Sequence, residues 1–327
     1  MTNGIRTLAL ASALLIAGAA QPQTNGAAAY PSHPIYWILP GAPGSPPDVA
    51  VRIVSEGLAR EIGQPVIIEN RPGASGTIAL AAVAKSAPDG YTLGFLSVPL
   101  MAAPSFFPTL PYDTLHDFVP VAQLVRTRFL LAVRADSPFR SLGGLISFAK
   151  AHPGRLTFAS VGNGSVPHLA GELLRLRAGI DIRHIPYKSG PFAFTALLGG
   201  QIDMVFSPPS TLSAHIKSGK LRALVTLAPM RLPEYPDVPT IAQAGFPGME
   251  MGDWFNMVAP AGTPQSVVDR LSAAVHKVLD QSEASGRLAA AGFAPVVDAG
   301  PDKLAALVES ELKHWAAVVR EAGIHGD

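Results

Sequence analysis

Short apolar runs alternate with helical patterns in two separate series, and this alternation restricts the fold of the chain more than any other feature. The first series comprises an apolar run at 35–39, a helical pattern at 49–63, an apolar run at 65–70, a helical pattern at 77–87 and an apolar run at 91–97. A second series of the same kind occupies 129–228. Such alternation predicts a parallel sheet covered by helices. Two series therefore predict two α/β lobes.

The segments around the second series predict how the lobes are connected. PTLPYDTLHDFVPVAQLV at 108–125 is expected to form a first crossover, and EMGDWFNMVAPAGTP at 250–264 a second. Two amphipathic helical patterns follow the second crossover. We therefore expect lobe one to comprise 30–128 and 255–327, and lobe two 129–254. A ligand cleft is expected between the lobes, at the carboxyl ends of the strands.

The first 29 residues have the pattern of a secretory signal peptide. A single cation, Arg6, precedes an apolar run from Leu8 to Ala20, which is too short to span a membrane. Small residues offer A-x-A cleavage sites at 17–19 and 27–29. We expect cleavage of residues 1–29 and export to the periplasm; the alternative is a buried first helix.

Composition and charge narrow the range of functions. The chain is 48% hydrophobic and has no cysteine, which removes disulfides, cysteine zinc ligands and thiol nucleophiles. Without Arg6 the 25 basic residues fall to 24, which balances the 24 acidic residues. No basic stripe stands out, so nucleic acid is not an expected partner. We expect a monomer that needs neither a metal nor a cofactor.

The loop after the first apolar run has the composition of an anion-binding loop. ILPGAPGSPPDV at 38–49 joins a strand to a helix, an arrangement in which backbone N–H groups can hold an anion. Ser45 and Asp48 match a capping box, in which the Ser45 hydroxyl accepts the Asp48 N–H. The two prolines between them lack an N–H, so Gly44, Ser45 and Ala42 are the expected donors. The alternative is a helix start that binds no ligand.

A similar loop lies in the second series. The residues Gly162-Asn163-Gly164-Ser165 follow an apolar run and precede a helical pattern. The glycines allow a ligand to approach the backbone closely. A ligand in the cleft would then lie between helix N-termini from both lobes. Another strand-to-helix junction, Tyr187-Lys188-Ser189-Gly190-Pro191, offers a third loop.

Sequence motifs typical of catalytic sites are weaker than these strand–loop–helix patterns. Ser147 and Lys150 match S-x-x-K, but neither S-D-N nor K-T-G accompanies them. Ser165 and His168 lie three residues apart without a G-x-S-x-G motif. We therefore expect a binding protein and no enzyme. An exported enzyme on the same scaffold, or a degenerate receptor that acts through protein contacts, are the alternatives.

Three runs of sequence, in order, carry a family resemblance: GQPVIIENRPGASGTIALAAVAKSAPDGYTL, GNGSVPHLAGELLRLRAGIDIRHIPYKSG and PDVPTIAQAGFPG. They resemble the Bug family, the periplasmic substrate-binding receptors of tripartite tricarboxylate transporters. The resemblance covers nearly all of the mature chain. It implies a two-lobed, type II periplasmic binding protein of the Venus-flytrap kind, which captures a small carboxylate, amino acid or related metabolite without chemistry. It also implies delivery to membrane permease subunits or to a sensor.

The resemblance implies a ligand held by the loops at 40–48 and 162–168. The expected ligand-binding residues are Gly41, Ala42, Pro43, Gly44, Ser45, Asp48, Ser97, Asn163, Gly164, Ser165, His168, Ser189, Gly190, Phe206 and Ser207.

Some of these positions depart from the family pattern. Gly41 stands where an aromatic residue is usual, Ser45-Pro46-Pro47 replaces a glycine-rich end, and Ser207 stands where an acid is common. The prolines remove backbone donors, and Gly41 leaves space beside the loop. These departures predict either a ligand bulkier than a four-carbon diacid or one whose acid group is held mainly by the 162–165 loop.

Overall fold

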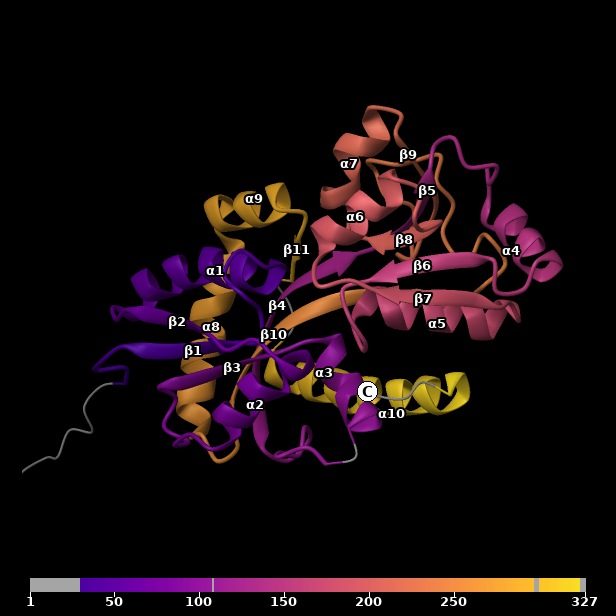
Figure 1. Ribbon diagram of the computed structural model, residues 1–327. Helices are drawn as coiled ribbons and strands as arrows, with labels where there is room; N and C mark the ends of the chain where they lie inside the picture. Colours follow the sequence, from indigo (N-terminus) through magenta and orange to yellow (C-terminus); the bar gives the residue numbers. More distant parts are fainter. Residues whose placement is uncertain (1–29, 108, 297–299, 324–327) are drawn as a thin grey trace, which may run out of the picture.

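The computed structural model describes residues 30–107, 109–296 and 300–323, which form two lobes, each built on a mixed sheet (Figure 1). The sheet of lobe one has the order β11 (Ala294–Pro295), β4 (Phe118–Arg128), β10 (Gly252–Pro260), β3 (Thr92–Leu96), β1 (Ile35–Leu39) and β2 (Val66–Asn70). The sheet of lobe two has the order β7 (Ile182–Pro186), β6 (Leu156–Ser160), β8 (Met204–Ser207), β5 (Leu130–Arg134) and β9 (Leu221–Thr226).

Helices pack around both sheets. Those that belong with the first sheet are α1 (Pro46–Ile62), the short 3-10 turn η1 (Ala74–Gly76), α2 (Thr77–Ala84), α3 (Val98–Phe106), α8 (Gln265–Asp280), α9 (Ser282–Ala290) and α10 (Pro301–Ala322). Those of the second lobe are α4 (Leu142–Ala151), α5 (Val166–Ala178), α6 (Gly190–Leu198) and α7 (Pro209–Lys217).

The pairing of the strands confirms the predicted parallel sheets only in part. Strand β1 pairs in parallel with β2 and β3, and β6 pairs in parallel with β7 and β8. In contrast, β10 is antiparallel to both β3 and β4, and β5 is antiparallel to β8 and β9. The expectation of wholly parallel sheets is wrong because β4 carries the chain out of lobe one and β10 brings it back.

The two crossing strands form the connection between the lobes. Strand β10 pairs with β4 over its whole length, from Gly252 opposite Arg128 to Pro260 opposite Phe118. Only Phe129 separates β4 from β5, so the chain passes directly from one sheet into the other. Any opening or closing of the lobes must therefore bend these paired strands near residues 128–130 and 252.

Apolar packing also continues from one lobe into the other. One buried cluster combines Met101 of α3, Phe158 of β6, Leu173 of α5 and Trp315 of α10. Helix α10 packs against both α3 and α5, and it runs from lobe one along the underside of lobe two in Figure 1. Separate clusters fill the rest of each lobe. The lobes thus share a continuous apolar cluster that also includes Phe118 and Trp254 of the crossing strands.

The predicted signal peptide, residues 1–29, lies outside the described residues. Within the described ranges, no helix combines the length and the hydrophobicity that crossing a bilayer requires.

Candidate ligand-binding cleft

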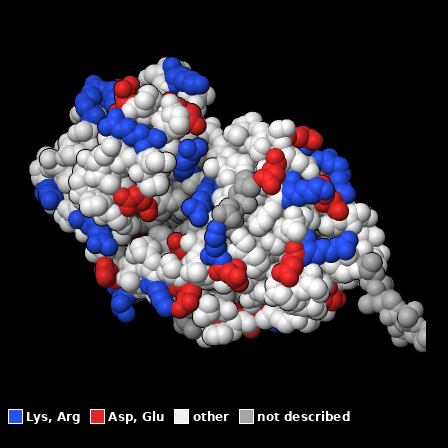
Figure 2. Space-filling view, turned by 180° about the vertical axis from the view of Figure 1, so that it is seen from behind, with Lys and Arg blue, Asp and Glu red and all other residues white. Residues whose placement is uncertain are grey.

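A cleft of about 1360 Å³ lies between the two lobes. Its walls come from the loops at 40–47, 165–167 and 188–191, from the end of β8 and from the crossing strands β4 and β10. The molecular surface is hollowed between the lobes when it is seen from behind, and acidic and basic side chains are interspersed over this face (Figure 2). The cleft therefore lies at the strand-to-helix junctions, where the sequence places its glycine-rich loops.

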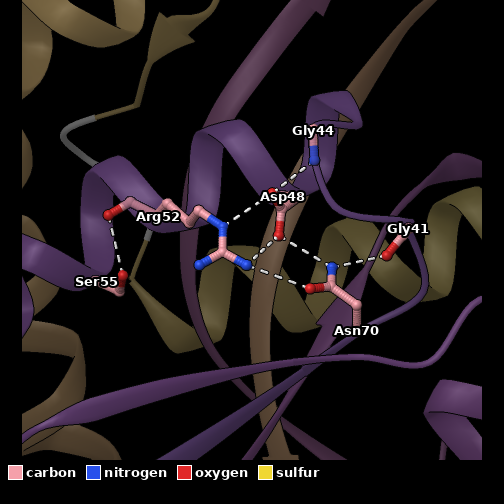
Figure 3. A network of polar contacts seen from close by, with 6 residues as sticks. All are labelled: Gly41, Gly44, Asp48, Arg52, Ser55 and Asn70. Atoms are coloured by element: carbon pink, nitrogen blue, oxygen red, sulfur yellow. Dashed lines mark hydrogen bonds and ion pairs between the residues drawn. The ribbon is translucent and has the colours of Figure 1, made fainter.

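Asp48 organises the first of these loops (Figure 3). Its Oδ2 accepts the Gly44 N–H at 2.8 Å and a bond from Arg52 Nε at 2.9 Å, and its Oδ1 accepts Asn70 Nδ2 at 3.0 Å. Asn70 Nδ2 also donates to the Gly41 carbonyl at 2.8 Å. Burial raises the pKa of Asp48, but the hydrogen bonds from Arg52, Gly44 and Asn70 outweigh it and leave that pKa below its usual value. Asp48 is thus an ionised structural group that faces its own lobe.

The predicted capping box does not form in the expected way. Ser45 is the N-cap of α1, and the prolines occupy the first two helical positions as expected, but the Ser45 hydroxyl makes no capping bond and is buried without a partner. A Cβ on Gly41 would lie 2.2 Å from Ser45 Oγ. The space expected beside Gly41 is therefore occupied by this hydroxyl, so the prediction of extra room there is wrong.

Most backbone donors of the first loop are already engaged. The Gly44 N–H is bound by Asp48, and the Ser45 N–H donates to the Ala42 carbonyl at 3.0 Å. Of the three expected donors, Ala42 alone has an N–H that bonds to none of the described residues. The loop offers a ligand fewer donors than its glycine content suggests.

The second loop repeats this construction with a different side chain. The Gly164 N–H donates to His168 Nδ1 at 3.0 Å, just as the Gly44 N–H donates to Asp48. Gly44 and Gly164 have φ values of 79° and 75°, a region that glycine reaches without strain. His168 is buried, and this burial, with a smaller contribution from His184, lowers the pKa of His168 to about 3. The group that holds the second loop is therefore neutral, whereas Asp48 is charged.

The structure places the expected ligand-binding residues in three surroundings. Those that line the cleft are Gly41, Ala42, Pro43, Gly44, Ser45, Ser165, Ser189, Gly190, Phe206 and Ser207. Those buried outside the cleft lining are Asp48 and His168, which hold their loops, and Ser97, which is the N-cap of α3. Asn163 and Gly164 instead border a separate pocket of about 110 Å³. In that pocket Ser75 Oγ donates to the Asn163 carbonyl at 3.2 Å, across the two lobes.

The titratable side chains that line the cleft are Lys188, His215 and Asp253. Lys188 stands in the third predicted loop. His215 and Asp253 do not follow from the loop patterns, because they lie within α7 and near the start of β10. The signal for Asp253 is its position: it is an acid in a predicted crossover, and a crossover has to pass the base of an interlobe cleft.

Comparison with known proteins agrees with this architecture. A profile of the family described as tripartite tricarboxylate transporter family receptor matches residues 50–324. The protein BugT of Bordetella pertussis is 39% identical over 309 residues, which cover 94% of each chain.

Two solved structures from Rhodopseudomonas palustris have the same fold. MatC with bound malate is 36% identical with a TM-score of 0.79, over 89% of this chain and 100% of MatC. Rpa4515 with adipate is 31% identical with a TM-score of 0.80, over 90% of this chain and 99% of Rpa4515. The profile and these relatives confirm the family resemblance seen in the sequence. The chain belongs to the receptor family of the tripartite tricarboxylate transporters, whose members are periplasmic solute-binding proteins.

Proposed function

We propose that this receptor captures a small organic carboxylate in its interlobe cleft and delivers it to a membrane permease or to a sensor. The observation that carries the proposal is the cleft itself, which opens between helix N-termini of both lobes. Helix N-termini favour anions. The relatives MatC and Rpa4515 were solved with malate and adipate, which are both dicarboxylates. The pattern of residues 1–29 supports action in the periplasm after export.

Lobe two supplies the cationic contribution to binding. Lys188 is exposed in the cleft and forms no ion pair with a described residue. It lies beside Ser189, the N-cap of α6, whose hydroxyl makes no capping bond. A carboxylate placed here would meet an ammonium group together with the positive end of a helix dipole.

The geometry around Ser165 argues against the alternative of an exported enzyme. The Ser165 hydroxyl donates to the Gly162 carbonyl at 2.6 Å. The ring of His168 accepts the Gly164 N–H through Nδ1 and is buried away from the cleft. A serine nucleophile needs a base within hydrogen-bond reach of its hydroxyl. Here the serine and the histidine both serve to shape the loop.

A binding screen with a matched pair of variants tests the proposal. Mono- and dicarboxylates, amino acids and aromatic acids are added to the mature protein, and unfolding temperature and binding heat are measured. A ligand at about 100 times its dissociation constant should stabilise the fold by about 2.7 kcal/mol. Lys188→Gln should weaken binding about ten-fold, whereas Lys150→Gln, an exposed position on α4, should not.

Recovery of unchanged ligand after long incubation completes this test. Binding without consumption is expected of a receptor. The proposal fails if no carboxylate binds, or if the bound acid is converted to a product.

A further inference from the structure

Asp253 is the one carboxylate among the described residues that line the cleft. It stands near the start of β10, where the chain returns to lobe one, and its backbone is held by Thr127 of β4. Thr127 Oγ1 accepts the Asp253 N–H at 3.1 Å and donates to the Asp253 carbonyl at 3.4 Å. The side chain therefore projects from a fixed point on the paired crossing strands.

One oxygen of Asp253 is held, and the other is not. Oδ1 accepts the N–H groups of Val98 at 3.1 Å and Trp254 at 2.9 Å, while Oδ2 has no hydrogen-bond partner among the described residues. The side chain is partly buried, and it lines the cleft. Burial raises the pKa of Asp253 to about 7, although the two backbone N–H groups oppose the rise. Because Oδ2 has no hydrogen-bond partner among the described residues and the side chain lines the cleft, this oxygen is available to a hydrogen-bond donor on a ligand.

The two lobes present different charged groups to the cleft, Asp253 from lobe one and Lys188 from lobe two. In lobe one, the starts of both α1 and α3 are already bound by carboxylates of the chain, Asp48 at Gly44 and Asp253 at Val98. In lobe two, the start of α5 is bound by the neutral His168, and Lys188 stands just before α6. A ligand carboxylate therefore belongs against lobe two, and the group that faces Asp253 should be a donor or a cation.

We propose that Asp253 is a specificity-determining residue that accepts a hydrogen bond from an ammonium or hydroxyl group on the end of the ligand remote from its carboxylate. This inference rests on the carboxylate-binding function proposed above. It predicts that the receptor prefers acids with a donor at the far end over diacids, because a second carboxylate would meet Asp253 as a like charge.

A series of acids that differ only at the far end tests the role of Asp253. Butanoate, pentanoate and hexanoate are compared with their ω-hydroxy, ω-amino and ω-carboxy derivatives by calorimetry at mildly alkaline pH. The ω-amino or ω-hydroxy acid should bind at least about ten-fold more tightly than the diacid of the same length. Asp253→Asn should remove this preference and strengthen diacid binding about ten-fold.

Asparagine preserves the local structure in this test. Its side-chain oxygen can still accept the N–H groups of Val98 and Trp254, so the crossing strands keep their contacts. Asp237→Asn makes the same chemical change at an exposed position outside the cleft and should leave all affinities unchanged. Unfolding temperatures of the ligand-free variants establish that both are folded.

The outcomes separate this inference from the proposed function. If acids bind but their order of affinity is the same in the wild type and in Asp253→Asn, the role of Asp253 is overturned and the carboxylate receptor stands. Tightest binding of a diacid to the wild type would also overturn it. If no carboxylate binds to either protein, the proposed function fails and this inference fails with it.

Discussion

At the scale of single residues, the two loops of the cleft differ mainly in the group that holds them. Asp48 and His168 each accept the N–H of a glycine four residues earlier, from Gly44 and Gly164. The aspartate adds a negative charge that Arg52 compensates, and the histidine adds none because its pKa is low. The same loop geometry is therefore obtained with an ion pair in the first loop and a neutral side chain in the second.

The buried histidine gives a specific pH dependence of stability. The pKa of His168 is about 3 in the folded protein, below the usual histidine value of 6.5, so the unfolded chain takes up the proton first on acidification. The free energy of unfolding should therefore be fully retained above pH 6.5 and decline as the pH falls toward 3. In His168→Asn this decline should be smaller by about 1–3 kcal/mol, measured by urea unfolding. Equal pH slopes in the two proteins would contradict the assignment.

Asp48 should be important for stability and for the shape of the first loop. Asp48→Ala removes the acceptor for Gly44, Arg52 and Asn70, so the N–H of Gly44 loses its partner within the loop. We expect a loss of about 2–4 kcal/mol in the free energy of unfolding. Asp48→Asn, which keeps an acceptor oxygen, should lose less. If the two variants are equally stable, the hydrogen bonds to this carboxylate do not hold the loop.

At the scale of helices and strands, the periodic elements could be predicted, whereas helix α3, whose periodic pattern two prolines interrupt, could not. The helix at 265–280 is amphipathic, so its sequence pattern reveals it. Helix α3 was not predicted, because Pro99 and Pro104 interrupt its pattern; Pro99 lies in its first turn and Pro104 is accommodated within it. The antiparallel pairing of β10 depends on contacts between residues far apart in the chain, which periodicity does not report.

For the candidate site, the loops could be predicted from the sequence, but the direction of individual side chains could not. The loops at 40–47 and 188–191 follow from local strand–loop–helix signals, and the structure brings them to one cleft. The side chains that turn away, Asp48 and His168, match the loop pattern equally well in sequence. Their direction is set by partners elsewhere, such as Asn70 for Asp48. Asp253 required the path of the returning strand to be known.

The start of α1 offers a prediction at this scale. Pro46 and Pro47 occupy the first two helical positions, so two backbone donors are absent at the cleft. Replacing both with glycine should strengthen the binding of succinate about ten-fold, because it adds these two donors. It should also lower the unfolding temperature, because glycine gives the unfolded chain more conformational entropy than proline does. Pro301→Gly, at the first position of α10 and outside the cleft lining, should lower stability without affecting binding. Weaker succinate binding after the glycine exchange would mean that the prolines shape the site.

At the scale of the whole molecule, export is expected before the receptor can act. Arg6, the short apolar run and the A-x-A sites predict removal of residues 1–29. Mass spectrometry of periplasmic protein should find a first residue near Gln21 or Tyr30. Intact Met1 in a cytoplasmic fraction would contradict the prediction.

The dimensions of the cleft predict that the lobes close on the ligand. A volume of about 1360 Å³ exceeds the range of about 300–1,000 Å³ that is common for small-ligand sites. A small acid fills only part of such a space, so we expect the walls to approach one another when the acid binds tightly. The paired strands β4 and β10 offer a hinge, because the chain passes between the sheets there with one residue between β4 and β5.

Distance measurements between labels on the two lobes test this closure. The chain has no cysteine, so Lys85→Cys and Lys150→Cys place spin labels at two exposed sites, one on each lobe. A carboxylate that binds in the screen should shift the distance between the labels and narrow its distribution, and small-angle scattering should show a smaller radius of gyration. A label pair within lobe two, at Lys150 and Lys217, should not respond, because each lobe moves as a unit about the crossing strands. If neither measurement changes at saturation, the shared apolar contact through α3, α5 and α10 holds the lobes at a fixed angle, and the ligand must bind to one lobe alone.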